Sequence, residues 1–381
     1  MTIRCLPSRL HRPKARAGMS DSGTKRGRVS PPWWALLSLA VVPAFAAPPS
    51  APKPDPALDV YAAPAQRVDI GKGRHLNLRC SGQGEPTVIL EAGFAADSLA
   101  WARSQPAIAE HNRVCAYDRA GMGYSDAGPL PRDLAADVDD LHALIDAADI
   151  DTPVILVGHS YGSQVVRRFD TLYPKWVSAL ILIDPPEQNV GEFSPAYAKT
   201  EAEIAPKMLA MYRACEQGAK DGKLAATTPP PALRNCLRGA NPNYSDGLNA
   251  AIRGWRSQPA FWESMISASQ QRAALYAGAV AKSERHDGKP LIVLSADRPY
   301  QGVAPDDLKA LTAAREQTHL ALMASSRAGK RVVIENSSHD IPNDQPTATA
   351  IAVFEAMQMR KRGKDQASRG LLWRIGDRAF H

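Results

Sequence analysis

Residues 154–163 have the sequence VILVGHSYGS, an apolar run that leads into a serine between two glycines. Its first four residues are apolar and predict a buried strand, while the residues after Gly162 suit a helix. A chain that passes from strand to helix so abruptly goes through a strained corner, and the glycines at 158 and 162 let the two elements pack closely. Ser160 lies at the tip of that corner, near the positive end of the helix dipole. The segment therefore predicts a nucleophile elbow with Ser160 as nucleophile.

A serine hydroxyl is a weak nucleophile, so it needs a general base, which is itself oriented by an acid. His339 is the candidate base, because it follows the strand predicted over 331–336 and lies in the loop SSHDIP near the end of the chain. The other histidines considered, His142, His159, His286 and His319, suit packing or surface roles better.

The identity of the acid stays open between two aspartates. Asp297 follows the strand predicted over 290–295, and Asp184 ends the strand predicted over 179–184. Either strand end places a carboxylate near the histidine, and we favour Asp297.

The tetrahedral intermediate of such chemistry carries an oxyanion that needs N–H donors. One predicted donor is the backbone N–H of Tyr161, directly after the nucleophile. The other is that of Phe94, which follows the strand predicted over 87–93 and the flexible Gly93.

Apolar runs and helical spacings alternate along most of the chain. Strands are predicted at 75–80, 87–93, 113–118, 154–157, 179–184, 290–295 and 331–336, and helices at 132–148, 163–172 and 346–357. Such alternation predicts an α/β fold with a mainly parallel central sheet covered by helices on both faces. Residues 61–185 and 288–360 form the two parts of this core, and 361–381 form a basic tail.

Residues 186–287 interrupt the pattern with helical stretches and no good strand. They predict a helical cap inserted between the sixth and seventh strands, and such insertions commonly cover active sites. The cap is rich in large apolar side chains, which either line a substrate pocket or form the cap's own core: Met208, Met211, Tyr212, Tyr244, Trp255, Phe261, Trp262 and Met265.

The N-terminal residues 1–46 have the features of a signal peptide. They carry eight basic residues against one acidic residue, which accounts for the whole formal charge of +7 and leaves the rest of the chain neutral, so no nucleic-acid partner is expected. A short apolar run from Trp33 to Val42 precedes Ala44-Phe45-Ala46, which suits cleavage by signal peptidase and is too short to span a bilayer. We expect translation to start at Met19, a Pro-rich linker over 47–60, and an exported protein, periplasmic or secreted, without a membrane span when mature.

Six segments together resemble the α/β-hydrolase superfamily, specifically bacterial serine hydrolases with a helical cap: EAGFAADSLAW, VCAYDRAGMGYSD, VILVGHSYGS, LILIDPP, PLIVLSADRP and VVIENSSHDIPNDQP. The resemblance implies a serine hydrolase with a Ser-His pair and leaves the substrate open. We expect hydrolysis of a carboxylic ester of a small or medium apolar acid through an acyl-enzyme, without cofactor or metal. Asp118 and Arg119 would have no catalytic role. The alternative is an amidase or aminopeptidase similar to proline iminopeptidases. A third hypothesis is a non-catalytic binding protein of this fold.

The resemblance also implies how the cysteines pair. In this superfamily the second strand pairs with the fourth, which would bring Cys80 next to Cys115. Cys215 and Cys236 both lie in the predicted cap, where a second bond would staple two helices. An oxidising compartment permits both disulfides.

Overall fold

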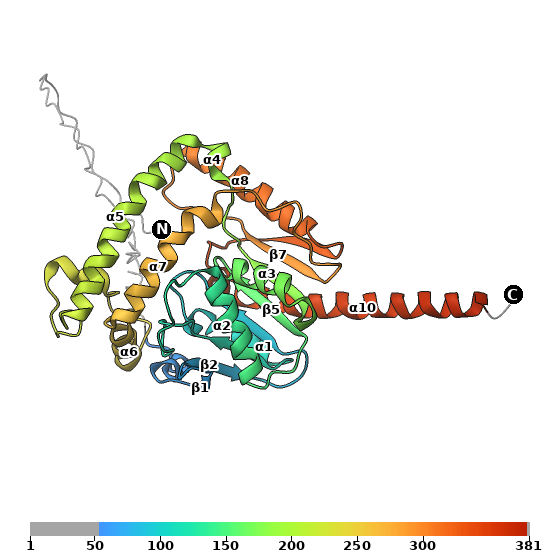
Figure 1. The fold of residues 1–381 in the computed structure, drawn as a ribbon, viewed down its shortest axis with the longest axis horizontal. Coiled ribbons are helices and arrows are strands. Elements are labelled where there is room, and N and C mark those ends of the chain that lie inside the picture. Colours follow the sequence, from blue (N-terminus) through green and yellow to red (C-terminus); the bar gives the residue numbers. More distant parts are fainter. Residues whose placement is uncertain (1–52, 379–381) are drawn as a thin grey trace, which may run out of the picture. The chain divides into compact units, whose positions relative to one another are not determined.

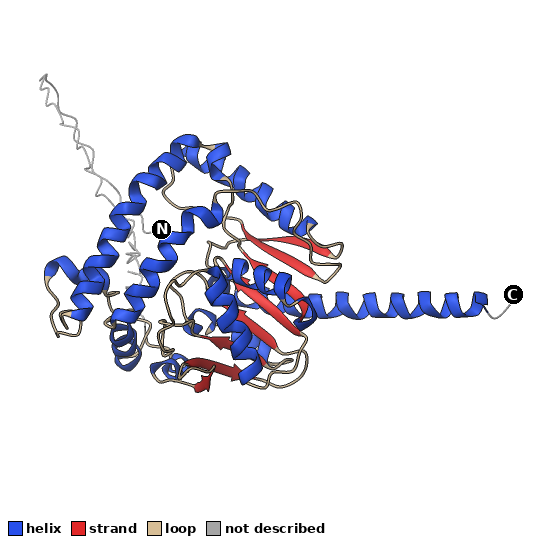
Figure 2. Ribbon diagram, viewed as in Figure 1, coloured by secondary structure: helices blue, strands red, loops and turns tan. Residues whose placement is uncertain are grey.

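The computed structural model describes residues 53–378, with side chains to residue 362. The predicted signal peptide and the start at Met19 lie outside the described residues. Eight strands form one sheet in the order β1-β2-β4-β3-β5-β6-β7-β8, with helices on both of its faces (Figures 1 and 2). Strands β3 to β8 run parallel to one another, and β2 pairs antiparallel with both β1 and β4. The predicted α/β fold is therefore confirmed.

The strands lie where the apolar runs predicted them. Their bounds are β1 Gln66–Asp69, β2 His75–Ser81, β3 Val88–Glu91, β4 Val114–Tyr117, β5 Val154–His159, β6 Val177–Ile183, β7 Leu291–Ala296 and β8 Gly329–Ile334. Strands β3 to β7 are buried on both faces, which explains their continuous apolar sequences.

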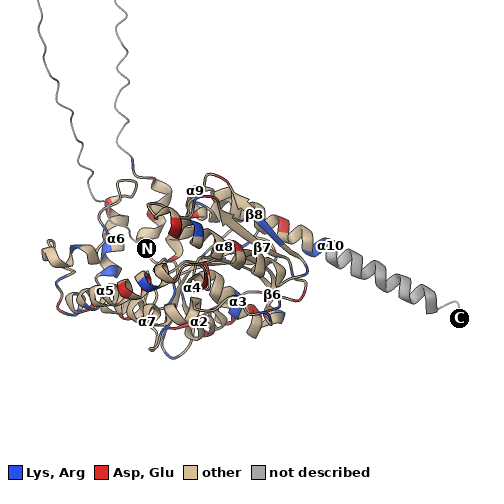
Figure 3. Ribbon diagram, turned by 90° about the horizontal axis from the view of Figure 1, so that it is seen from above, with Lys and Arg blue, Asp and Glu red and all other residues tan. Residues whose placement is uncertain are grey.

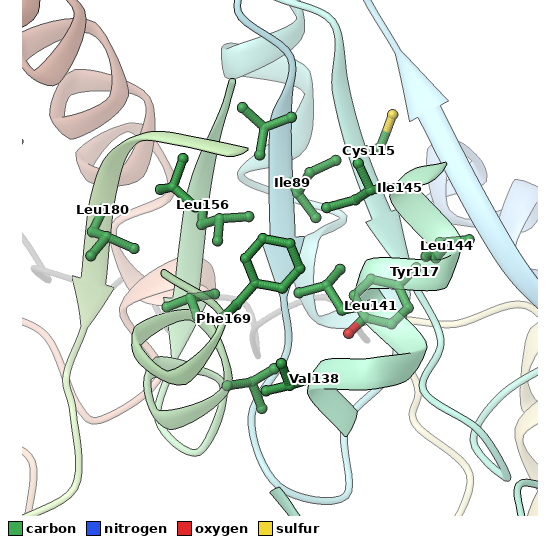
Figure 4. Close-up of a cluster of buried hydrophobic side chains, with 14 of the residues drawn as sticks. Ile89, Cys115, Tyr117, Val138, Leu141, Leu144, Ile145, Leu156, Phe169 and Leu180 are labelled. Carbon is green, nitrogen blue, oxygen red and sulfur yellow. The ribbon is translucent and has the colours of Figure 1, made fainter. Parts of the chain in front are cut away.

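Successive side chains of the central strands enter two separate hydrophobic clusters. In β3, Ile89 faces one cluster, while Val88 and Leu90 face the other. The first cluster packs against helices α2 (Leu134–Ala147), α3 (Gly162–Leu172) and α8 (Pro305–Ala324) (Figure 4). The second packs against α1 (Gln105–Ala109) and α10 (Pro346–Arg378). These two layers hold the sheet rigidly, so the ends of its strands are fixed in space.

Helices fill the chain between β6 and β7, as the sequence predicts. They are α4 (Val190–Phe193), α5 (Pro195–Lys220), the short 3-10 helix η4 (Pro231–Cys236), α6 (Asp246–Arg256) and α7 (Pro259–Tyr276). Tyr212, Phe261, Trp262 and Met265 are buried together in a cluster of this insertion, whereas Met211 is exposed. With Met208 packed against this cluster, five of the eight large apolar side chains expected in the cap belong to the insertion's own core.

Three details differ from the sequence analysis. Residues 56–62 form a 3-10 helix (η1, Pro56–Ala62) instead of the end of a linker, and Tyr61 is buried there. Strand β1 was not predicted, because only one of its four residues, Val68, is buried. Helix α10 continues to Arg378, beyond the helix predicted over 346–357, so residues 361–378 of the predicted basic tail are helical.

Both predicted disulfides are present. Cys80 and Cys115 face each other in the register of β2 and β4 and are bonded. Cys215 of α5 is bonded to Cys236 of η4. The first bond joins the antiparallel edge of the sheet to its parallel part, and the second closes the outer end of the helical insertion.

Acidic and basic residues are interspersed along the ribbon (Figure 3), in keeping with the neutral formal charge of the chain after residue 46. Across residues 53–378, no helix is at once long and apolar enough to cross a membrane.

Candidate active site

Ser160 lies at the corner between β5 and α3. Its φ of 51° is in the left-handed region, which a non-glycine residue adopts only where the surroundings impose it. The corner is tight because a side chain at Gly158 would meet the carbonyl of Gly162, and one at Gly162 would meet the carbonyl of Glu91. The glycines thus allow α3 to begin directly against β3 and β5, and the predicted turn is present.

His339 connects this serine to a carboxylate. Its Nε2 lies 2.9 Å from the Ser160 Oγ, and its Nδ1 lies 2.6 Å from the Asp184 Oδ2. The three residues come from the ends of β5 and β6 and from the loop after β8. Strands β5 and β6 are adjacent in the sheet, and His159 pairs with Ile183. Ser160 and Asp184 are the next residues of the two strands, so they lie at neighbouring strand ends.

Asp184 is held in place by two further groups. Its side chain is 1% exposed, and its Oδ1 accepts hydrogen bonds from the Ala296 N–H, at 2.9 Å, and from the Arg315 guanidinium. Arg315 projects from α8 and is itself buried. A buried carboxylate keeps its charge only when such partners compensate for lost water. Arg315, which the sequence analysis did not single out, supplies that compensation.

The structure corrects the preferred choice of acid, because Asp297 does not contact His339. Its carboxylate accepts hydrogen bonds from the N–H groups of Asn336 and Ser337, both at 2.9 Å. These donors hold the pKa of Asp297 below its usual value. Asp297 therefore ties the end of β7 to the loop that carries His339, and Asp184, the alternative acid, lies at the histidine.

His159 supports the same loop from the other side. Its Nε2 lies 2.8 Å from the carbonyl oxygen of His339, which can only accept, so His159 donates there. Burial lowers the pKa of His159 to about 3, so its ring is neutral near pH 7. The sequence favoured a surface or packing role for His159. Its contact with the backbone of His339 could not be predicted, because the two residues are far apart in the sequence.

The two predicted oxyanion donors flank the serine corner. A side chain at Gly93 would come within 3.4 Å of the Ser160 Cβ, so the loop after β3 passes directly beside the serine. The rings of Phe94 and Tyr161 pack edge to face, with centroids 6.4 Å apart. Over the described part of the chain, the N–H groups of Phe94 and Tyr161 have no acceptor within the protein.

Residues 88–353 match the model of the alpha/beta hydrolase family, which is more than half of the chain. The chain belongs to this family. The match includes Ser160, Asp184, Arg315 and His339, so the site described above lies within the part of the α/β hydrolase that the family shares.

Curated relatives of this α/β hydrolase are distant or partial. A probable transporter of Hormonema carpetanum, efuK, is 38% identical over 27% of the chain and 15% of its own length. YqjL of Bacillus subtilis is 21% identical over 72% of the chain and 84% of its own length. An AB hydrolase superfamily protein of Gibberella zeae is 34% identical over 24% of the chain and 29% of its own length. The chain thus spans less than two thirds of the efuK and Gibberella proteins.

Solved structures share the α/β-hydrolase fold at low identity. The epoxide hydrolase CorEH has a TM-score of 0.54 at 19% identity, over 76% of this chain and 97% of its own. CarC, a serine hydrolase involved in carbazole degradation, has a TM-score of 0.51 at 17% identity, over 78% of this chain and 100% of its own. Both likenesses concern the fold.

The pKa of the His339 imidazole gives this hydrolase a testable pH dependence. Partial burial of the ring lowers this pKa most, the Glu187 carboxylate raises it, and the Arg315 guanidinium lowers it further. A general base must be unprotonated, so with His339 as the expected base we expect activity to fall as the pH drops through this pKa. Because Arg315→Gln removes a positive charge beside the imidazole, the acidic limb of kcat/KM should move to higher pH.

The control for this pH profile is Arg298→Gln. Arg298 is exposed and lies beside Asp297, so its charge is screened by water and its loss should leave the acidic limb where it is. A limb that stays in place, or moves to lower pH, in Arg315→Gln would contradict the role given to Arg315.

Proposed function

We propose that this α/β hydrolase cleaves carboxylic esters with Ser160, His339 and Asp184 as its catalytic triad. The observation that carries the proposal is the hydrogen-bonded chain from the Ser160 Oγ through the His339 imidazole to the Asp184 carboxylate. His339 takes the serine proton as Oγ attacks the ester carbonyl, and Asp184 stabilises the resulting imidazolium. The imidazolium then protonates the departing alkoxide, and an acyl group remains on Ser160.

The second half of the reaction uses the same groups with water. His339 takes a proton from water, the hydroxide attacks the acyl carbonyl, and the proton returns to the Ser160 Oγ as the acid is released. In both halves the N–H groups of Phe94 and Tyr161 would bind the oxyanion. Two unpaired N–H groups beside the nucleophile suit that task, because they need no reorganisation when charge develops.

The identity of the nucleophile distinguishes the proposed ester hydrolysis from the activity of the structurally similar epoxide hydrolase CorEH. Enzymes of this fold that open epoxides or displace halide resemble this chain but use an aspartate at the corner, whereas this chain has Ser160. A serine favours acyl transfer.

We propose that the helical insertion is a cap and that the acyl group is small or medium-sized and apolar. Phe94 and Ala95 of the oxyanion loop, together with Met122, pack against the buried cluster of the insertion. Apolar side chains therefore border the serine on the side of the insertion. Such a border favours apolar acyl chains, because their burial is the dominant favourable term.

The test is a screen of the purified protein against p-nitrophenyl esters of graded acyl length, with aminoacyl anilides alongside. We expect the highest kcat/KM on short or medium acyl esters and little on anilides. Preference for the anilides would instead establish an amidase or aminopeptidase. A folded wild-type protein that neither hydrolyses any ester or anilide nor is labelled by a fluorophosphonate would contradict a serine hydrolase and favour a binding protein of this fold.

We also propose that the protein is exported. The support is the leader-like sequence that ends at Ala46 and two disulfides, which form readily in an oxidising compartment. N-terminal sequencing of protein from the periplasm or medium should begin near Ala47. A chain recovered from the cytoplasm with its leader intact and with Cys80, Cys115, Cys215 and Cys236 as free thiols would contradict export.

A further inference from the structure

Arg119 lies buried beneath the loop that carries the first oxyanion donor. It is 6% exposed, and its Nη1 donates to the Ala92 carbonyl at 2.7 Å while its Nη2 donates to the Gly93 carbonyl at 2.6 Å. Arg119 thus holds two consecutive carbonyls of the segment between β3 and Phe94. It follows β4, so this contact joins the ends of two neighbouring strands.

The Gly93 carbonyl belongs to the same peptide unit as the Phe94 N–H. In residues 53–378 only bonds that precede proline are cis, so this peptide is trans, and its C=O and N–H point in opposite directions. A guanidinium bonded to the oxygen therefore fixes the direction of the N–H. The Ala96 N–H also bonds the Gly93 oxygen, at 3.3 Å, which is longer than the bond from Arg119.

The same guanidinium contacts the second donor residue. Its central carbon lies 5.3 Å from the centre of the Tyr161 ring, and its Nε lies 3.9 Å from the Asp137 Oδ2. The Tyr161 hydroxyl donates to that same oxygen at 2.8 Å. Tyr161 is therefore held at its ring face and at its hydroxyl by one cluster, which we call the Arg119 cluster (Arg119, Glu91, Asp137).

The charge of Arg119 is compensated within the cluster. Glu91 is fully buried and accepts hydrogen bonds from Arg119 and from the Tyr117 hydroxyl. Lysine would not replace this arrangement, because its single ammonium cannot bond two adjacent carbonyls and a carboxylate with the fixed planar geometry of a guanidinium.

We propose that Arg119 is a positioning residue of the oxyanion hole, which fixes the Gly93–Phe94 peptide so that the Phe94 N–H points at the developing oxyanion. This inference rests on the proposed ester hydrolysis. It revises the purely structural role that the sequence implied for Arg119. The residue acts through the peptide and does not touch the substrate.

The experiment compares Arg119→Lys with Arg132→Lys. Arg132 is a matched control, because it is also buried and bonds Asp137, at 2.8 Å, as well as Asp140, yet its hydrogen bonds do not reach residues 92–94. The measurements are the melting temperature, kcat and KM on the best ester of the screen, and the Ki of a trifluoromethyl ketone. This inhibitor forms a tetrahedral oxyanion on Ser160 and so reports on the oxyanion hole.

Arg119→Lys should lower kcat by about 10²- to 10³-fold, which is the effect of losing one oxyanion donor, with KM within about threefold of wild type. The Ki should rise in proportion to the loss in kcat. Arg132→Lys should lower the melting temperature similarly, while kcat and Ki stay within about threefold. Equal loss of kcat in both variants, or a kcat of wild-type size in folded Arg119→Lys, would overturn the inference.

If Arg119→Lys does not fold, a second pair of variants tests the same inference. Glu91→Gln/Arg119→Met removes both charges together, which avoids leaving one buried charge unpaired. Glu91→Gln alone keeps Arg119 on the Gly93 carbonyl. The double variant should lose kcat and inhibitor affinity relative to Glu91→Gln, and equal values would overturn the inference. Absent turnover and labelling in the wild type would instead contradict the proposed function, and this inference with it.

Discussion

Replacing Ser160 by alanine should lower kcat by about 10⁶-fold on the best ester, to the rate left by the oxyanion hole and substrate binding. In the proposed mechanism, the substitution removes the oxygen that forms the acyl-enzyme. It should leave the fold intact, because a non-glycine residue already occupies this left-handed corner at φ 51°, and alanine adds no atoms. The measurement is kcat in protein whose melting temperature matches that of wild type.

Ser163→Ala is the matched control. Ser163 lies one helical turn further on, and its hydroxyl donates to the Ser160 carbonyl at 2.6 Å, so it does not face the substrate. We expect it to keep turnover within about tenfold and to be labelled by a fluorophosphonate at Ser160. Full activity in Ser160→Ala, or labelling at another serine, would show that the nucleophile is elsewhere.

Asp184→Asn should lower kcat by about 10⁴-fold, as loss of the triad carboxylate does in the chymotrypsin-type enzymes that define this effect. Asparagine can present its amide to the His339 Nδ1 in place of a charged acceptor. The imidazole then adopts the wrong tautomer, and the imidazolium loses its counterion. A moderate fall in melting temperature should accompany this loss, because Arg315 is left without its buried partner.

Asp297→Asn gives the contrasting result. Its carboxylate accepts hydrogen bonds from the N–H groups of Asn336 and Ser337 and lies beside the exposed Arg298, away from His339, so turnover should stay within about tenfold of wild type. Its lowered pKa means that it stabilises the loop above its usual pKa and loses that effect as the pH falls, so the variant should differ least from wild type in acid. Inactive, well-folded Asp297→Asn beside active Asp184→Asn would reverse the assignment.

The sequence predicts the elements whose signals are local. The buried parallel strands read as continuous apolar runs, and the corner at Ser160 is specified by glycines within four positions of one another. The two disulfides were expected from the family resemblance, Cys80–Cys115 through the pairing of two strands and Cys215–Cys236 through a shared place in the helical insertion. Strand β1 and the full length of α10 carry no comparable local signal.

The choice of acid depends on geometry that the sequence does not contain. Asp184 and Asp297 both end, or directly follow, apolar strands, and these strands are neighbours in the sheet. Which carboxylate meets His339 is decided by partners distant in the sequence: Arg315 and the Ala296 N–H for Asp184, and the loop N–H groups for Asp297. The proposed role of Arg119 could not be predicted for the same reason. Its sequence motif indicates a loop, but it does not indicate that the Ala92 and Gly93 carbonyls lie next to the guanidinium.

The helical insertion occupies a part of the chain that is separate from the proposed catalytic residues, so acyl selectivity and catalysis depend on different segments. Asp184 precedes the insertion and His339 follows it, and the chain leaves and re-enters the core through adjacent strands, β6 and β7. Residues 188–289 contain none of the groups that react in the proposed mechanism. They could therefore be replaced by the corresponding segment of a relative without changing a reacting group. Recombination at those two junctions would therefore transfer a new acyl preference to unchanged catalytic machinery in one step, a route to new specificities that point substitutions around the serine do not offer.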